Sequence, residues 1–363
     1  MSKLHSLLLL LLLTSGMVGC DAFGDDDSDD RRVSTSVFVG NQGNFSDGNG
    51  TVTTYNPDDQ TSTARAIGDL NSIVQSVTVA DGVLYVTANT GDRLYRFDAQ
   101  TLEAQPSISV FSPRYVAVDG DRAFVTSLFG GRGFFSGGRL SLVDLTGDGV
   151  VTDSLGAGEN PEGVLLTEER VYVAAHGFGN GSTVFAYDRQ GNIKAEIATE
   201  CAGPRALHED EQSEVWVICT GTVQYDDDFS VIGETPGEVL VLSGNAIVSR
   251  FPLDDRTATA GPGQESFYSE ESQTLVVVVG GNRIVRFDTE TNQAAGEITL
   301  PTDANPIGAI ALDGTRDRLY VARVPGFDVA GYVTVHAASG GAELGRFATG
   351  VAPTSIAIAT TDD

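Results

Sequence analysis

A unit of about 40 residues recurs along the chain, and this repeat restricts the possible fold more than any other feature of the sequence. The stretch "LYVTANTGDRLYRFDAQT" at residues 84–101 matches "LVVVVGGNRIVRFDTETN" at residues 275–292. Each copy reads as a strand, a loop, a second strand and a polar turn, and a further short apolar run precedes it. Short strands rich in β-branched and aromatic residues, without helical periodicity, predict the four-stranded blades of a β-propeller.

The chain contains seven such units, of which six are continuous and one is divided between the two ends. The continuous units are residues 72–112, 113–160, 161–203, 204–263, 264–305 and 306–352. Residues 33–71 supply three strands of the seventh unit, and "PTSIAIA" at 353–359 supplies its innermost strand. Joining the two hides strand edges that would otherwise template aggregation. We therefore predict an all-β, seven-bladed β-propeller over residues 33–363, closed by the C-terminal strand. An open pair of β-sandwiches explains neither the period nor the unpaired terminal strands.

Residues 1–19 read as a signal peptide rather than as part of the fold. Lys3 gives a basic start, and the leucine run at residues 7–13 is too short to span a bilayer permanently. "MVGC" at residues 17–20 resembles a bacterial lipobox, which implies cleavage before Cys20 and lipidation of that residue. The alternative is an ordinary secretory signal followed by an incidental cysteine. Residues 20–32 contain "DAFGDDDSDD" and predict a disordered acidic tether.

The charge balance argues against one class of partner. The chain has 22 Lys and Arg residues against 50 Asp and Glu residues, a net charge of -28. Such a surface repels nucleic acid, so we expect no nucleic-acid partner. We interpret the acidity as a means of solubility, including solubility in high salt. We also expect a monomer whose contact with the membrane is made only through the lipid.

The repeats resemble those of the YVTN/YncE-like β-propellers, and "YVTAN" at residues 85–89 is close to the signature of that family. The first unit, "VFVGNQGNFSDGNGTVTTYN" at residues 37–56, is similar to the opening repeat of propeller lipoproteins from Bacteroidetes-type bacteria. These include BtuG-like proteins, which capture vitamin B12 at the cell surface. Acidic residues behind the lipidated cysteine imply, by analogy with such bacteria, an anchor on the outer-membrane surface; a periplasm-facing anchor is the alternative.

The long loops are predicted to share one face of the propeller. With the strands of a blade labelled a to d outward from the axis, the b–c and d–a connections lie on the same face. The b–c loops at 41–50, 127–138, 176–182, 220–237 and 323–331 are long and irregular. Loops on a rigid scaffold are where binding groups concentrate. The candidate ligand-binding residues in these five loops are Phe45, Arg132, Phe134, Phe135, His176, Phe178, Tyr225 and Phe327. The alternative is that these loops pack against one another.

A second set of candidates lies where each innermost strand begins, one residue after a proline or its aligned equivalent. The polar residues there are Gln75, Arg114, Glu162, Arg205 and Glu265. Arg114 and Arg205 are suited to clamp a carboxylate or phosphate. The alternative, which the sequence leaves open, is that these residues form ion pairs between neighbouring blades.

Cys201 and Cys219 are predicted to form a disulfide. An even number of cysteines outside the cytoplasm favours a bond. Cys201 precedes strand a of its blade and Cys219 ends strand b, so both lie at the same end of adjacent strands. Two buried free thiols are the alternative.

From these features we expect a surface-anchored, non-catalytic protein that captures a bulky small molecule. Only the resemblance implies a corrinoid as the ligand and a TonB-dependent outer-membrane receptor as the partner. A lactonase-like enzyme is the rival, with Glu162, His176 and Glu265 as its candidate catalytic residues, and a protein-docking scaffold is a third possibility. We expect no metal, because no His pair or Cys cluster has metal-ligand spacing, and "DLTGDG" at residues 144–149 lacks the alternating Asp spacing and closing Glu of a calcium loop. We expect no cofactor, because propellers that bind a quinone are usually richer in Trp than this chain, whose one Trp is Trp216.

Overall fold

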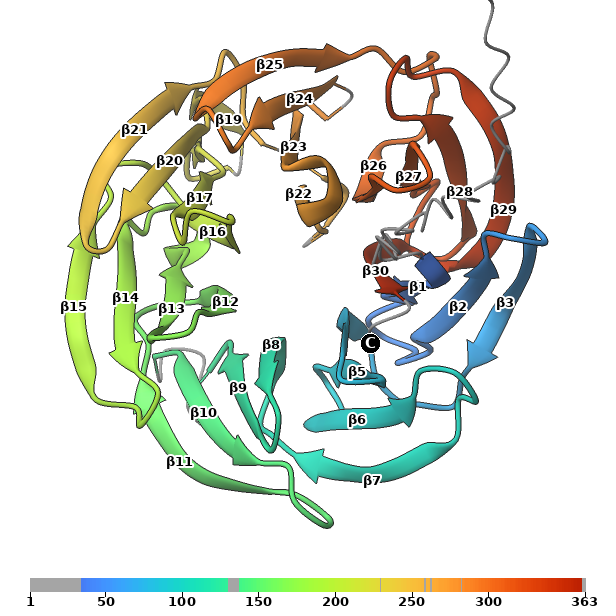
Figure 1. Ribbon diagram of the computed structural model, residues 1–363, viewed down its shortest axis with the longest axis horizontal. Coiled ribbons are helices and arrows are strands. Elements are labelled where there is room, and N and C mark those ends of the chain that lie inside the picture. Colours follow the sequence, from blue (N-terminus) through green and yellow to red (C-terminus); the bar gives the residue numbers. More distant parts are fainter. Residues whose placement is uncertain are drawn as a thin grey trace, which may run out of the picture. The chain divides into compact units, whose positions relative to one another are not determined.

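The computed structural model describes residues 34–129, 137–228, 230–257, 259–261, 263–281 and 283–360. The regular structure in this part of the chain is almost entirely β (Figure 1). Its helical elements are two single 3-10 turns, η1 (Gly177–Gly179) and η2 (Glu270–Ser272). Among the described residues, therefore, no helix is long and apolar enough to cross a membrane.

Seven four-stranded antiparallel sheets are arranged as the blades of a β-propeller, which confirms the fold predicted from the repeats. Six blades are continuous in sequence. Their strands are β4 (Val74–Ala80), β5 (Val83–Ala88), β6 (Arg93–Asp98) and β7 (Ala104–Ser109); β8 (Pro113–Asp119), β9 (Arg122–Ser127), β10 (Arg139–Asp144) and β11 (Val150–Gly156); β12 (Pro161–Leu166), β13 (Arg170–Ala175), β14 (Thr183–Asp188) and β15 (Ile193–Ala198); β16 (Pro204–Glu209), β17 (Val215–Cys219), β20 (Glu238–Ser243) and β21 (Ala246–Pro252); β22 (Ser266–Ser269), β23 (Thr274–Val279), β24 (Arg283–Asp288) and β25 (Gln293–Ile298); β26 (Ile307–Asp313), β27 (Arg318–Arg323), β28 (Ala330–Ala337) and β29 (Glu343–Val351). A short hairpin, β18 (Thr222–Tyr225) and β19 (Val231–Thr235), is inserted between β17 and β20.

The seventh blade joins the two ends of the sequence. Its innermost strand is β30 (Pro353–Thr360), which is followed outward by β1 (Ser34–Asn41), β2 (Thr51–Asn56) and β3 (Thr61–Ile67). β30 pairs antiparallel with β1, so that Val37 lies opposite Ile358 and Val39 opposite Ile356. β30 also contacts β26 on one side and β4 on the other. The last strand of the sequence therefore completes both the seventh blade and the ring of innermost strands.

The central strands of the blades are buried on both faces, which explains their unbroken apolar runs. Along β23, Val276 and Val278 pack against β26 and β27 of the next blade. Leu275, Val277 and Val279 point the other way and pack against β17 and β20 of the preceding blade. Because successive side chains of a strand point to opposite faces, a blade between two others needs apolar residues at every position.

A disulfide joins Cys201 and Cys219, whose Cα atoms lie 6.1 Å apart. The bond ties the connection before β16 to the end of β17, at the base of the loop that carries β18 and β19. Both half-cystines are buried in an apolar cluster with Val217 and Leu240. The bond therefore closes a loop around the first two strands of its blade.

Replacing both cysteines with alanine is expected to lower the free energy of unfolding by about 3 kcal/mol, since a bridge closing a loop of this size restricts the unfolded chain. Urea unfolding of the Cys201→Ala/Cys219→Ala variant beside the parent protein measures the difference. Quantitative thiol labelling of the denatured, unreduced parent provides the control. Two reactive thiols from these positions would contradict the bond.

Candidate functional site

One face of the propeller carries the exposed aromatic side chains. Among the described residues, every exposed Phe or Tyr side chain lies on a b–c loop or a d–a connection, and both kinds of connection lie on this face. Phe45 is 69% exposed, Phe178 and Tyr225 are each 56% exposed, and Phe327 is 40% exposed. Phe111, between β7 and β8, is 37% exposed. The exposed apolar residues elsewhere, such as Val150 and Ile193, are aliphatic side chains on outer strands.

The loop that presents Phe45 is fixed by its own hydrogen bonds. The side-chain oxygen Oδ1 of Asn44 accepts hydrogen bonds from the backbone N–H groups of Ser46 and Asp47. Asn49 Oδ1 in turn accepts one from the N–H of Asn44 at 2.7 Å. Such Asx turns let a short side chain replace a backbone partner. The ring of Phe45 is therefore held in solvent by an ordered turn. The candidates Arg132, Phe134 and Phe135 lie outside the described residues.

The polar residues at the starts of the innermost strands connect neighbouring blades. Arg114 donates to Gln75 Oε1 at 3.0 Å and forms an ion pair with Glu162, so it links β4, β8 and β12. Arg205 forms a second pair with Glu265, with 3.4 Å between Nη1 and Oε2. All five side chains are buried. The structure therefore places them in the inter-blade pairs that the sequence left as one of two possibilities, and not on the exposed loop surface.

Burial and pairing set the ionisation of these groups in different directions. Burial opposes the charge of Glu162, but the guanidinium groups of Arg114 and Arg205 outweigh it and lower the pKa of Glu162. Burial raises the pKa of Glu265, and the single nearby Arg205 offsets this only in part. Burial also disfavours the charge on Arg205, yet Glu265, Tyr115 and Glu162 together raise its pKa. Arg205 thus remains charged at the axis of the propeller.

His176 lies next to this layer and is held as a neutral ring. Its Nδ1 is 3.3 Å from Asn160 Nδ2, and its Nε2 is 3.1 Å from Thr220 Oγ1. Burial lowers the pKa of His176 to about 4, although the carboxylate of Glu162 partly opposes the shift. Both ring nitrogens are therefore occupied by neighbouring blades, so His176 acts as a connector in this arrangement.

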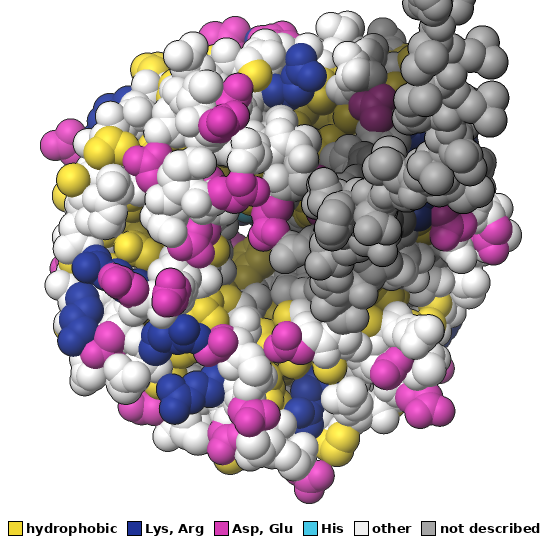
Figure 2. Space-filling view, in the orientation of Figure 1, with side chains coloured by type: hydrophobic (Ala, Val, Ile, Leu, Met, Phe, Trp, Pro, Cys, Tyr) yellow, Lys and Arg dark blue, Asp and Glu magenta, His cyan; other side chains and the backbone are white. Residues whose placement is uncertain are grey.

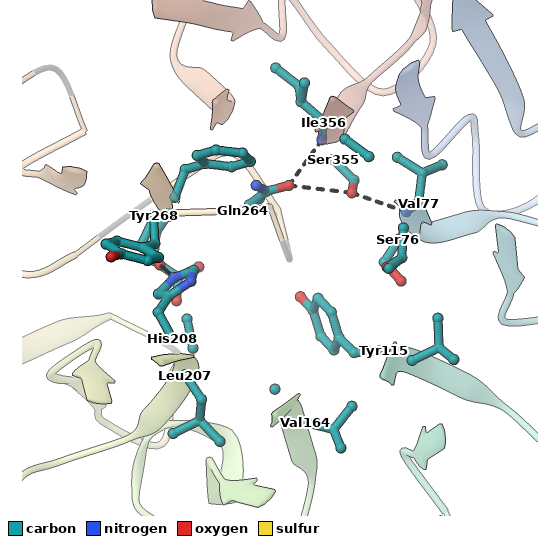
Figure 3. Close-up of a pocket in the computed structure, with 18 of the residues that line it drawn as sticks. Ser76, Val77, Tyr115, Val164, Leu207, His208, Gln264, Tyr268, Ser355 and Ile356 are labelled. Carbon is teal, nitrogen blue, oxygen red and sulfur yellow. Dashed lines mark hydrogen bonds between the residues drawn. The ribbon is translucent and has the colours of Figure 1, made fainter. Parts of the chain in front are cut away.

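A cavity of about 380 Å³ lies below the paired layer, among the innermost strands (Figure 3). Its wall includes Tyr115, Val164, Leu207, His208, Phe267 and Ile356. Arg205, Gln264 and Glu265 contribute its end nearest the long loops. Gln264 reaches across to β30, where its Oε1 accepts a hydrogen bond from the N–H of Ile356 at 2.9 Å. The wall of the cavity therefore mixes apolar side chains with polar ones such as His208, Ser76 and Ser266, and its loop-side end is polar.

A second cavity of about 210 Å³ continues from the first toward the opposite face. The two share Val79, Phe267, Tyr268 and Ile358 as lining residues. The smaller cavity is also lined by Glu270, Glu271 and Asp313, which lie at or beside the a–b turns. Figure 2 shows several Asp and Glu side chains beside the central opening of the face in view. The channel thus leads from an acidic opening to an apolar interior.

Sequence reasoning overlooked the residues of this channel, notably Tyr115, His208, Gln264 and Tyr268. His208 Nε2 lies 2.9 Å from Ser266 Oγ, and burial lowers the pKa of His208 to about 4. Burial likewise raises the pKa of Tyr115. The signal that could have found Tyr115 was a large aromatic residue at a position where the other repeats carry small ones. His208 and Tyr268 occupy one aligned position in successive repeats, where the other repeats carry small or aliphatic residues. Within the described residues, no group of three His, Cys, Asp or Glu side chains is arranged to hold a metal ion.

Comparisons with known proteins support the fold and identify the family. A chain of the Kuenenia stuttgartiensis hydrazine synthase superposes with a TM-score of 0.61 at 16% sequence identity, over 78% of this chain and 89% of that one. This likeness concerns the fold alone. No curated protein matches the sequence. The family described as "Domain of unknown function (DUF5074)" matches residues 35–342. Because that match spans most of the propeller, the chain belongs to the DUF5074 family.

Proposed function

We propose that this protein is a lipid-anchored, non-catalytic capture protein that binds a bulky small molecule on its loop-rich face. The observation that carries the proposal is the confinement of the exposed Phe and Tyr side chains, among the described residues, to the connections of that face. Rigidly presented aromatic rings offer large contact area at little conformational cost. The ordered turn around Phe45 supplies such rigidity.

The dimensions of the channel favour the loops as the site for a bulky ligand. At about 380 Å³, the central cavity is near the lower limit for drug-sized molecules. A macrocycle such as a corrinoid would therefore rest across the b–c loops. The resemblance to BtuG-like lipoproteins suggests a corrinoid as the ligand. It also suggests that a lipid on Cys20 anchors the protein, as a monomer, to the outer membrane. From there the protein would deliver its ligand to a TonB-dependent receptor.

The pairing of the candidate catalytic residues supports binding without catalysis. Glu162 is engaged by Arg114, and Glu265 by Arg205. His176 is held between Asn160 and Thr220 and has a pKa of about 4, so it is a poor general base near neutral pH. A lactonase-like reaction would require these groups to leave their present partners.

Calorimetric titration of the purified protein with cobalamin is the direct test. We expect saturable binding, weakened about tenfold or more by each of Phe45→Ala, Phe178→Ala and Phe327→Ala, because aromatic anchors dominate such interfaces. Ile193→Ala, at an exposed position on the outer strand β15, is the matched control and should leave the affinity unchanged. Absence of binding at micromolar concentrations would exclude the corrinoid, and unchanged affinity in all three aromatic variants would exclude the loop face.

A further inference from the structure

The central channel contains a set of side chains that the loop-face proposal does not use. Its cavity is enclosed by innermost strands of six blades, since β4, β8, β12, β16, β22 and β30 all contribute lining residues. Aromatic rings of Tyr115, His208, Phe267 and Tyr268 stand around the space, and Figure 3 shows the Tyr115 ring directed into it. Aliphatic side chains such as Leu207 and Ile356 complete the wall. A planar aromatic ring would contact these rings and branched side chains, beside the serine side chains that also line the cavity.

The loop-side end of the cavity has unmet hydrogen-bonding capacity. Arg205 and Glu265 are 8% and 2% exposed, and both line the cavity. Glu265 Oε1 and Arg205 Nε have no hydrogen-bond partner among the described residues. Both atoms are shielded from solvent, so a ligand reaches them only when the two side chains turn toward the cavity. One of these atoms accepts a hydrogen bond and the other donates one. Buried polar atoms without partners are costly, so a bound group that both donates and accepts at this end would relieve the cost.

The charge around the channel selects against an anion. Arg205 and Glu265 already neutralise each other, so a charged head group would bring an additional unpaired charge into a buried space. The outer cavity is lined by Glu270, Glu271 and Asp313, and Asp313 is itself paired with Arg316. An acidic approach repels anions and admits neutral or cationic molecules.

We propose that the channel is a second ligand site, distinct from the loop face, for a small aromatic molecule with an uncharged hydrogen-bonding end of the carboxamide type. The ligand enters from the face opposite the b–c loops, through the neck at Val79, Phe267, Tyr268 and Ile358. Its ring packs against Tyr115 and Phe267. Its amide faces Arg205 and Glu265, where the amide oxygen accepts and the amide N–H donates.

Benzamide, benzoate and benzylamine have the same ring and differ in the charge of the head group, so they are suitable probes for the purified protein. In ligand-observed NMR titrations we expect saturable binding of benzamide at about millimolar concentration or below, as befits so small a ligand. Benzoate should bind about tenfold more weakly or worse, because its charge is unpaired in the channel. Equal binding of benzoate and benzamide, or no saturation by benzamide, would overturn the proposal.

Val79→Trp locates the site, since Val79 lines both cavities and a bulky ring there would block the neck. We expect benzamide binding to be lost in this variant and retained in Val150→Trp, at an exposed position on the outer strand β11. Tyr115→Leu removes the ring from the wall while keeping an apolar side chain. If Val79→Trp does not fold, the loss of benzamide binding in Tyr115→Leu is the test of the site. Phe45→Ala should leave benzamide binding unchanged. Full binding by either channel variant would place the site elsewhere.

Discussion

A chain that ends at Ala352 is expected to lose cooperative folding. The truncation removes β30, which pairs with β1 and lies between β26 and β4. Ile356 then leaves a buried cluster that contains Val37, Val39 and Tyr320. The unpaired edge of β1 is exposed as a template for aggregation. The free energy of unfolding of a domain is only about 5–15 kcal/mol. Losing the contacts of an entire buried strand therefore costs more free energy than the remaining ring has in reserve.

Circular dichroism during thermal unfolding, together with light scattering, measures this outcome. The matched control ends at Thr360 and keeps all of β30. We expect the control to unfold in one sharp transition and the shorter chain to aggregate or to unfold without one. A sharp, unshifted transition in the chain that ends at Ala352 would show that the ring does not depend on its last strand.

Arg114→Ala is expected to destabilise the protein by about 3–5 kcal/mol, because it leaves the buried carboxylate of Glu162 without its partner. Arg114 is 8% exposed and also donates to Gln75, so the substitution removes links to two neighbouring blades. Arg65→Ala is the matched control. Arg65 pairs with Asp69 on the surface, where both side chains are largely exposed, and its loss should cost about 0.5 kcal/mol or less.

The pH dependence of this loss distinguishes an unpaired charge from lost packing. In the parent protein the pKa of Glu162 is lowered, so its contribution is present above the unfolded pKa and is lost as the pH falls. In Arg114→Ala, burial would raise that pKa instead, and protonation would relieve the cost as the pH falls. The difference in urea midpoint between variant and parent should therefore shrink from pH 8 to pH 5. A difference that does not change with pH would mean that packing alone is responsible.

The blades could be predicted from the sequence because the residues that build them repeat. Runs such as "LVVVV" at residues 275–279 in β23 are apolar throughout because both faces of the sheet are covered. The prolines Pro113, Pro161 and Pro204 mark the starts of innermost strands. The divided seventh blade followed from simple counting of strands. The inserted hairpin β18–β19 was missed, although "TVQYDDDFSVIGET" places two short alternating runs around an acidic turn.

The channel could not be predicted because it depends on distances between blades. The position two residues after the innermost-strand proline, or its aligned equivalent, carries Ser76, Gly163, Ala206 and Ser266, all small. A Cβ at Gly163 would lie 2.5 Å from the carbonyl oxygen of Arg205 in the next blade. Close approach of neighbouring strands therefore explains the small residues, and Tyr115 stands at the same position as the exception. The pairing of Arg114 with Glu162 was one of the two possibilities that their aligned positions left open, and only the distance between the blades decides between them.

The position of Ser34 has a mechanical consequence for any tether that precedes it. The backbone carbonyl of Ser34 accepts a hydrogen bond from Arg316 at 2.8 Å, and Ser34 lines the outer cavity beside Asp313. The described residues therefore begin on the face opposite the aromatic loops. Residues 20–33, if fully extended, would span at most about 50 Å. The lipid that we propose on Cys20 would tether the protein through the short segment that precedes Ser34. An attachment at Ser34 would leave the aromatic loops on the face away from it and the acidic opening of the channel on the same face as it.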